Sequence, residues 1–334
     1  MKIIIDNRAL KSALDYIAFL YKGRDKASAV CFSVEDGIFR IIGEQSVLFQ
    51  HSMTVNVQEA DTATVMFMDV SSLLPTDGFA EIEIVNNTVN ISSSNFGVLL
   101  LPASSLLYAY AVDKERVSMF NAMNLINLES KLRYVSSIAK LFKTDIEVYF
   151  DGDYANIYFS TIWLRHRGVS LNTTLTIENI RRIARFNPTG SYTEEDALIF
   201  TKNSKDTILV IPLSKKKQKP DFEEALPRNI AMFDWKIGLL RNGLKAFNNT
   251  VKDGIVSLAL DSEGVTKILA ERGTLKAFYV SGYMGDIVFM LNIPIEYIIL
   301  ILGFIDTGEV KIGKDDNKVW IQGRNTDILM SVRD

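Results

Sequence analysis

The same order of helices and strands occurs three times along this chain of 334 residues, at a spacing of roughly 110 residues. Each repeat is expected to hold an amphipathic helix, paired strands, a second short helix and further strands. The long helices are predicted to start near Asn7, Asn127 and Asp234, and the short ones near Asp69, Thr176 and Pro294. Three similar modules joined end to end predict an arc, which can close on a second copy of itself by two-fold symmetry.

The length of the chain is too great for one ordinary core and suits two or three domains. The repeat predicts three domains, over residues 1–104, 105–219 and 220–334. A lysine-rich stretch at 214–220 separates the second domain from the third. We interpret this stretch as a solvated linker, with contact to DNA or to a partner protein as the alternative.

The residue patterns within the modules indicate an α+β fold with antiparallel strands. In the first module, apolar residues recur at helical spacing after Asn7, a plausible N-cap. Two alternating strands, at 80–85 and 88–92, flank an Asn-Asn pair that is typical of a hairpin turn. The other predicted strands are 3–5, 29–34, 38–43, 50–57, 96–101, 145–150, 155–161, 207–213, 255–260, 265–271, 309–313, 318–322 and 327–332.

Cys31 is the only cysteine, so an internal disulfide and a cysteine-rich zinc site are both excluded. We expect it to be a buried structural residue in a protein of the reducing cytoplasm. The N-terminus reads as a strand and lacks the features of a signal peptide. No metal and no cofactor is expected.

The positive charge of the chain is concentrated on its predicted helices. A net charge of -3 argues against a conventional basic DNA-binding domain, but it allows one positive surface. Most of these cations lie opposite the apolar stripes, and the alternative is an ordinary solvated helix face. The candidate DNA-binding residues are Arg8, Lys11, Arg24, Arg133, Lys140, Arg181, Arg182, Arg185, Lys236, Arg241 and Lys245.

Four short stretches carry a resemblance to a known family. These are Phe-Gly-Val-Leu-Leu-Leu-Pro-Ala at 96–103, Ser-Thr-Ile-Trp-Leu-Arg at 160–165, Pro-Asp-Phe-Glu-Glu-Ala-Leu-Pro-Arg-Asn at 220–229, and Ile-Leu-Met-Ser-Val-Arg-Asp at 328–334. In this order, and within three modules, they resemble the bacterial-type DNA polymerase sliding clamp over the whole length of the chain. Ser331, Asp334 and the Ile162-Trp163 pair depart from the family pattern, which suits a phage or otherwise divergent member.

The resemblance implies three clamp domains with helices inside and antiparallel sheets outside, closed into a ring as a homodimer. Such a ring encircles duplex DNA and tethers the replicative polymerase for processive synthesis. Polymerase and clamp loader would dock through short peptide motifs in a pocket between the second and third domains. Carried over by position, the pocket residues are Thr161, Trp163, Arg165, Pro227, Met232, Leu329, Met330 and Val332.

Two further expectations concern the dimer and the alternatives to a clamp. Phe96 and Val98 lie where the family has its first-domain interface strand, which predicts that they form the dimer interface. The alternative for the pocket residues is that they form plain inter-domain core rather than a peptide-binding pocket. An enzyme is not expected, because the two histidines, His51 and His166, lack metal spacing and no catalytic motif is present. Asp-Gly-Asp at 151–153 reads as a hairpin turn. The alternative function is a clamp-like partner-binding protein that does not encircle DNA, such as a transcription co-activator or a monomeric processivity subunit.

Overall fold

The structure is a computed structural model, and its elements fall into two compact units. The first unit comprises Met1–Ala122 with Arg181–Ser214, and the second comprises Met123–Ile180 with Lys215–Asp334. The residues that the structure describes are 1–21, 28–57, 59–141, 146–159, 161–202, 206–213, 222–227, 230–240, 255–272, 275–306, 308–315 and 317–331.

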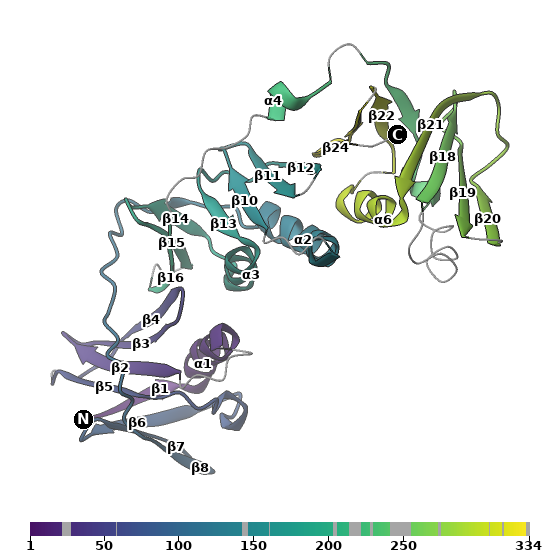
Figure 1. Ribbon diagram of the computed structural model, residues 1–334. Helices are drawn as coiled ribbons and strands as arrows, with labels where there is room; N and C mark the ends of the chain where they lie inside the picture. Colours follow the sequence, from purple (N-terminus) through teal and green to yellow (C-terminus); the bar gives the residue numbers. More distant parts are fainter. Residues whose placement is uncertain are drawn as a thin grey trace. The chain divides into compact units, whose positions relative to one another are not determined.

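The first unit contains an eight-stranded antiparallel sheet in the order β5-β2-β3-β4-β16-β15-β14-β9 (Figure 1). Its strands are β2 (Ala29–Glu35), β3 (Ile38–Glu44), β4 (Leu48–Thr54), β5 (Asp61–Met66), β9 (Ser118–Met119), β14 (Gly190–Thr193), β15 (Ala197–Lys202) and β16 (Thr207–Pro212). The pairing of β4 with β16, from Leu48↔Val210 to His51↔Thr207, joins strands of the first and second predicted domains in one sheet. The two compact units do not coincide with the three predicted domains, so the three-domain division stays a prediction.

A four-stranded antiparallel sheet completes the first unit, in the order β1-β6-β7-β8. Its strands are β1 (Lys2–Asp6), β6 (Phe79–Val85), β7 (Thr88–Ser93) and β8 (Phe96–Leu100). The turn between β6 and β7 has positive φ at both Asn86 and Asn87, the conformation of the predicted hairpin turn. Cys31 is buried in β2, as predicted.

Helix α1 (Asn7–Tyr21) contacts strands of both sheets in the first unit (Figure 1). Its residue Ile17 approaches β3 so closely that a Cβ at Gly43 would lie 2.9 Å from the Ile17 side chain. The helix starts where predicted, but its cap is Asp6, whose Oδ1 accepts hydrogen bonds from the backbone N–H of Arg8 and Ala9. The predicted cap, Asn7, is buried and donates to the Asp77 carbonyl instead.

The short helix predicted near Asp69 is only a single 3₁₀ turn, η1 (Ser71–Leu73). Leu74, which follows it, is extended with φ -71° and ψ 126°. A proline disfavours the α conformation of the residue before it, so Pro75 ends the turn at once.

The second unit is built around an eight-stranded antiparallel sheet in the order β13-β10-β11-β12-β24-β23-β22-β17. Its strands are β10 (Glu147–Phe150), β11 (Tyr154–Phe159), β12 (Ile162–Arg167), β13 (Thr174–Thr176), β17 (Phe233–Trp235), β22 (Val310–Lys314), β23 (Lys318–Gln322) and β24 (Thr326–Ser331). Asp151, Gly152 and Asp153 form the turn between β10 and β11, as predicted, with Gly152 at φ +96°.

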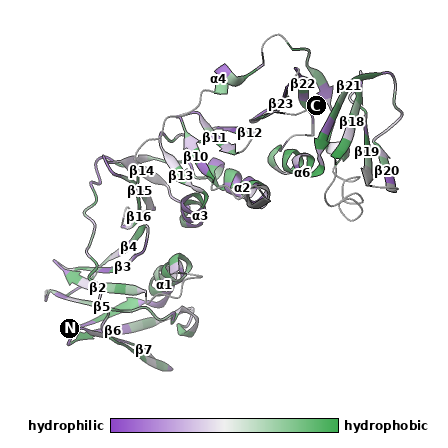
Figure 2. Cartoon of the chain, in the orientation of Figure 1, coloured by the Kyte–Doolittle hydropathy of each residue, from purple (hydrophilic) through white to green (hydrophobic). Residues whose placement is uncertain are grey.

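A four-stranded sheet, β20-β19-β18-β21, and two packed helices accompany it. These elements are β18 (Ile255–Asp261), β19 (Thr266–Arg272), β20 (Leu275–Val280), β21 (Ile287–Pro294), α2 (Met123–Leu141) and α6 (Ile295–Phe304). Gly303 of α6 lies directly against the Tyr134 ring of α2, a closeness that only a residue without a side chain permits. The apolar residues of α6 appear green in Figure 2 and are mostly buried.

Three further helical elements are α3 (Ile177–Phe186), α4 (Phe222–Ala225) and η2 (Ile237–Leu239). The division between the two units falls within α3. Asp234, predicted to start a long helix, lies in β17, so that helix start is wrong. The described strands that were not among those predicted are β5, β9, β12, β13, β14, β15, β17, β20 and β21. None of the helices described is both long and apolar enough to cross a membrane.

Candidate functional site

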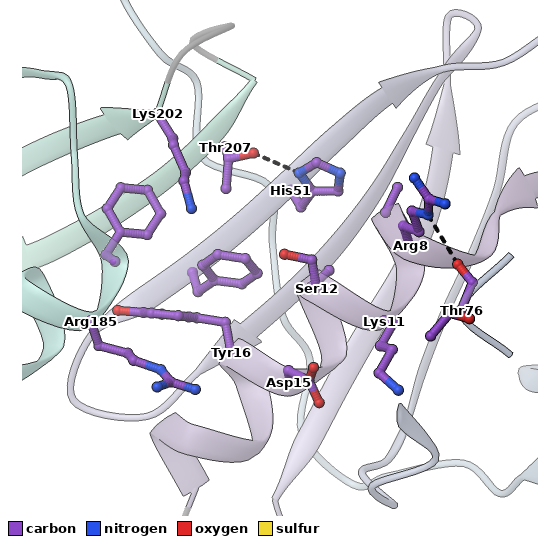
Figure 3. Close-up of a pocket in the computed structure, with 14 residues that line it drawn as sticks. Arg8, Lys11, Ser12, Asp15, Tyr16, His51, Thr76, Arg185, Lys202 and Thr207 are labelled. Atoms are coloured by element: carbon purple, nitrogen blue, oxygen red, sulfur yellow. Dashed lines mark hydrogen bonds between the residues drawn. The ribbon is translucent and has the colours of Figure 1, made fainter. Parts of the chain in front are cut away.

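A cavity of about 640 Å³ opens in the first unit beside α1 (Figure 3). Its walls come from α1, from the paired strands β4 and β16, and from the ends of α3 and β15. Four cationic side chains line it, against the single carboxylate of Asp15. The cations are Arg8, Lys11, Arg185 and Lys202.

The four cationic side chains of the cavity differ in whether a carboxylate neutralises them. The Arg8 guanidinium forms an ion pair with Asp77, and its Nε donates to the Thr76 carbonyl at 3.1 Å. Lys11 is half-buried and Lys202 is exposed, and neither forms an ion pair with a carboxylate in the described ranges. The two lysines therefore bring positive charge that is not neutralised within the described part of the chain.

The inner wall of the cavity is aromatic. The Tyr16 ring lies 4.7 Å from Phe49 and 5.6 Å from Phe186 between ring centroids. The Tyr16 hydroxyl donates to the Arg182 carbonyl at 2.7 Å, and burial raises the pKa of this phenol. Tyr16 therefore contributes a neutral, fixed surface rather than a titrating group.

His51 adds a polar group whose hydrogen bonding is incomplete. Its Nδ1 lies 2.6 Å from Thr207 Oγ1, across the β4–β16 pair (Figure 3). Its Nε2 is buried and has no hydrogen-bond partner within the described residues. Burial lowers the pKa of the imidazole, so the ring is neutral at pH 7.

The three arginines predicted on α3 do not share one role. Arg181 and Arg185 are exposed, and the Arg185 guanidinium lies 5.7 Å from the centroid of the Phe19 ring. Arg182 is buried, and its Nη1 donates to Ser46 Oγ at 2.6 Å. Its assignment to a DNA-facing surface is wrong, because a guanidinium packed inside the unit cannot reach a phosphate.

The remaining candidate cations have mixed placements. Arg133 is exposed on α2 and forms an ion pair with Glu129, one turn earlier, at 3.4 Å. Lys236 is half-buried just before η2. The backbone of Lys140 belongs to α2, but its side chain lies outside what the structure describes. Three candidates fall outside the described residues altogether, namely Arg24, Arg241 and Lys245.

Two of the predicted partner-peptide residues, Trp163 and Leu329, are paired on one face of the large sheet in the second unit. Directly paired residues of antiparallel strands place their side chains on the same face. Such pairs join Tyr158, Trp163, Leu329 and Trp320 in turn, across β11, β12, β24 and β23. Trp163 and Leu329 are each 6% exposed. We call these four residues the aromatic row.

Helix α4 packs on the aromatic row. The Phe222 ring lies 5.0 Å from Trp163 at an interplanar angle of 89°, and Leu226 also joins this cluster. Lys318 Nζ donates to the Ala225 carbonyl at 2.7 Å, which fixes the end of α4. The segment after α4 continues to Pro227, a buried member of the predicted pocket.

The structure corrects the predicted role of Met330. Successive residues of a strand point to opposite faces, so Met330 lies on the face opposite Leu329, where it is 0% exposed. It belongs to the core rather than to the aromatic row. Thr161 is exposed, and Met232 is half-buried with its sulfur against Gly313. Val332 lies outside the described residues.

Arg165 is buried beside the aromatic row and is fully engaged. Its Nε and Nη2 donate to Asp327 Oδ2 at 3.1 and 2.9 Å. Its guanidinium also lies 4.3 Å from the Tyr154 ring centroid and 4.2 Å from that of Phe222. Arg165 thus links α4 to two strands, a structural role that the sequence did not show.

The candidate dimer strand β8 is an edge strand of its sheet. Phe96 and Val98 are half-buried on one face, and Leu99, on the other face, is 58% exposed. An apolar edge strand of this kind is a template for pairing with another chain.

One polar cluster of the second unit was missed by sequence reasoning. Lys131 of α2 is 3% exposed, and its Nζ lies 2.6 Å from an Asp306 oxygen. The same ammonium group donates to His166 Nδ1 at 3.2 Å, since a lysine cannot accept. His166 is a buried residue of β12. Lys131 could not be distinguished in the sequence from a solvated helix lysine.

The stability of the protein should decrease below pH 6.5 because of His166. Burial, followed by the charge of Lys131, lowers the pKa of His166 from 6.5 to about 4. Since the unfolded chain binds this proton more tightly, the stability from a neutral His166 is complete above pH 6.5 and is lost as the pH falls toward 4. The full loss corresponds to about 3 kcal/mol, with about 2 kcal/mol lost by pH 5.

Urea unfolding at pH 7.5, 6 and 5 measures this loss. A His166→Asn variant serves as the control, because it removes the titrating group while keeping a polar side chain of similar reach. An equal loss of unfolding free energy in the variant and the parent would contradict the assignment to His166.

The fold as a whole matches solved structures over its full length. The DNA polymerase III subunit beta from Pseudomonas aeruginosa has a TM-score of 0.78 at 17% identity, with 100% of both chains covered. The DNA polymerase sliding clamp from Caulobacter crescentus has a TM-score of 0.78 at 13% identity, again with 100% of both chains covered. The chain has the fold of a bacterial sliding clamp. The Helicobacter pylori beta clamp in complex with 5-chloroisatin agrees, with a TM-score of 0.76 at 14% identity and 99% coverage of each chain.

The clamp fold confirms the resemblance and the α+β fold class predicted from the sequence. No protein-family model and no curated protein matches the sequence itself. The likeness to clamps is therefore one of fold, at 13–17% sequence identity.

Proposed function

We propose that this chain is a DNA sliding clamp, which encircles duplex DNA and tethers a replicative polymerase for processive synthesis. The observation that carries the proposal is the full-length agreement of its fold with sliding clamps. The role is mechanical, so we propose no catalysis. The protein would act in the cytoplasm as a homodimer of three-domain chains, divided at 1–104, 105–219 and 220–334.

The DNA-facing side chains would be the exposed or half-buried cations of the helices. Lys11, Arg133, Arg181 and Arg185 are the described residues that fit this role, together with Arg8. A closed ring stays on DNA by topological linkage and needs no tight grip. Its phosphate contacts can therefore be few, independent of sequence and sensitive to salt.

Ring closure would use two of the edge strands of the described sheets. Strand β8 is the edge of one four-stranded sheet, and β20 is an edge of the other. The two large sheets formed by the described residues each have eight strands. Pairing β8 of one copy with β20 of a second copy would join two four-stranded sheets into one eight-stranded sheet. Two such junctions would close the dimer.

The polymerase and the clamp loader would dock with short peptides at the aromatic row. Tyr158, which is 48% exposed, and the half-buried Trp320 offer apolar surface there, and apolar or aromatic anchors usually dominate such binding. Two indole N–H groups, of Trp163 and Trp320, are buried without a hydrogen-bond partner in the described part of the chain. A peptide carbonyl that reached either one would satisfy it.

Retention on circular DNA tests the proposal. The protein is incubated with nicked circular plasmid, separated from free protein by gel filtration, and then treated with a restriction enzyme that cuts once. A ring should stay on the circle and slide off the linear product. Equal retention on both forms, or on neither, would favour the clamp-like protein that does not encircle DNA.

Charge reversal on the helices should weaken the association with DNA. For Arg133→Glu with Arg181→Glu, we expect the slope of log K against log salt to decrease by about one for each lost phosphate contact. Fluorescence anisotropy with a duplex at several salt concentrations measures the slope. The control is Lys267→Glu with Lys311→Glu, two exposed strand lysines. A slope that changes equally in both variants would place the DNA elsewhere.

A further inference from the structure

We propose that the cavity beside α1 is a fixed anion site that takes one phosphate group of a nucleic-acid backbone. The assignment of the anion to nucleic acid rests on the proposed function, whereas the anion site itself rests on the cavity alone. Such a site differs from the loose contacts of exposed helix cations, because its charges and its walls surround a defined space.

The first argument is the balance of charge. Four cationic groups and one carboxylate line the cavity. Lys11 and Lys202 form no ion pair with a carboxylate in the described residues, and they come from α1 and β15, elements that lie on different sides of the cavity in Figure 3. An anion between them would be attracted from more than one direction, which favours a compact charge such as a phosphate.

The second argument is the wall behind the charges. Phe49, Phe186 and Tyr16 form a neutral aromatic surface that is almost wholly buried. Water is excluded on that side of the cavity, so the effective dielectric constant is lower than at an open surface. The attraction between a bound anion and the lysines is correspondingly stronger.

The third argument is the unsatisfied nitrogen of His51. A buried polar atom without a hydrogen-bond partner destabilises the protein, and a ligand that supplies the partner removes that cost. The Thr207 hydroxyl can donate to Nδ1, which leaves the proton on Nε2 as a free donor. A phosphate oxygen, or a water held by it, would supply the missing acceptor.

Size and position point to a phosphodiester. The volume of about 640 Å³ falls within the range of small-ligand sites and admits a phosphate with its flanking sugars. Arg8, Lys11 and Arg185 also belong to the candidate DNA-facing set, so the cavity continues that surface. Lys202 and His51 were not in that set, because only the β4–β16 pairing brings them beside α1.

The histidine ring provides a direct measurement. The chain has only two histidines, so protein carrying ¹³Cε1-labelled histidine gives two ring signals. Titration with inorganic phosphate at constant ionic strength should shift the His51 signal along a saturating curve. His166 lies in the other unit, is enclosed by Lys131, and should not shift. No saturating shift at His51, or an equal shift of both signals, would overturn the anion site.

Matched variants and a nucleic-acid probe complete the test. Lys11→Gln and Lys202→Gln should each weaken phosphate binding about tenfold, whereas the exposed strand variant Lys267→Gln should not. A short DNA duplex should shift the same His51 signal and compete with phosphate. Phosphate binding without any effect of the duplex would overturn the assignment to nucleic acid. If the unaltered protein is retained on circular DNA but binds no phosphate at this cavity, only this inference is overturned and the proposed function stands.

Discussion

Replacing Phe96 and Val98 with glutamate is expected to convert a dimer of this chain into a folded monomer. Both side chains lie on edge strand β8, and pairing there would bury them against a second copy. Four carboxylates per ring would then lack solvation at the two junctions. Buried anchors typically contribute about 2 kcal/mol or more each, so we expect the dissociation constant to rise about a thousandfold. Light scattering across a dilution series measures it.

The control makes the same double change at exposed strand residues away from β8. Thr62 lies on β5, the edge of the large sheet in the first unit, and Thr54 lies at the end of β4; both are exposed. Glutamate at these two positions should leave the mass unchanged. A β8 variant that remains dimeric at nanomolar concentration would show that the interface lies elsewhere.

Mixing two variants tests which edge is the partner of β8. Phe278 is 71% exposed on β20, and Phe278→Glu should also yield a monomer. The β8 variant keeps an intact β20, and the β20 variant keeps an intact β8. Their mixture should therefore form a heterodimer through one undamaged junction. If β8 paired with β8 instead, the mixture would contain no such heterodimer.

Replacing Asp327 with alanine is expected to lower the free energy of unfolding by about 3–5 kcal/mol, because it leaves a buried guanidinium without its counter-ion. The two partners are 10% and 12% exposed in their side chains, and both Arg165 donors use one Asp327 oxygen. The rings of Tyr154 and Phe222 prevent the guanidinium from turning toward water. Urea unfolding at one fixed protein concentration measures the loss.

The double variant Arg165→Met with Asp327→Leu is the matched control. Replacing a whole buried pair with apolar side chains of similar size is often nearly neutral. It should therefore recover most of the stability that Asp327→Ala loses. A single variant that loses less than about 1 kcal/mol would mean that water reaches Arg165 after all.

Patterns of neighbouring residues in the sequence predicted those structural features that neighbouring residues alone determine. The Asn-Asn hairpin at 86–87, the start of α1 and the buried Cys31 all follow from a few neighbouring residues. The shortened η1 shows the limit, because Pro75 acts on the one residue before it and outweighs the apolar pattern.

The candidate site depended on contacts that the sequence does not display. Arg182 and Lys131 look like solvated helix cations, but both are buried by elements far away in the chain. Met330 was placed on the wrong face, because strand alternation separates it from Leu329. The cavity beside α1 exists only because His51 and Thr207 pair across 156 residues.

That separation has a consequence for how the protein is made. In each large sheet, a central strand is synthesised well before the strand that pairs with it, which is encoded about half a chain later. These pairs are β4 with β16 and β12 with β24. Arg165 and Asp327 stand 162 residues apart, and β24 lies near the end of the chain. At ribosomal speeds of about 5–20 residues per second, β12 leaves the ribosome about ten seconds or more before its partner. Through that interval the nascent chain exposes an apolar strand edge, so the growing protein depends on chaperones, or on slow synthesis in a dilute cell, to escape aggregation before it is finished.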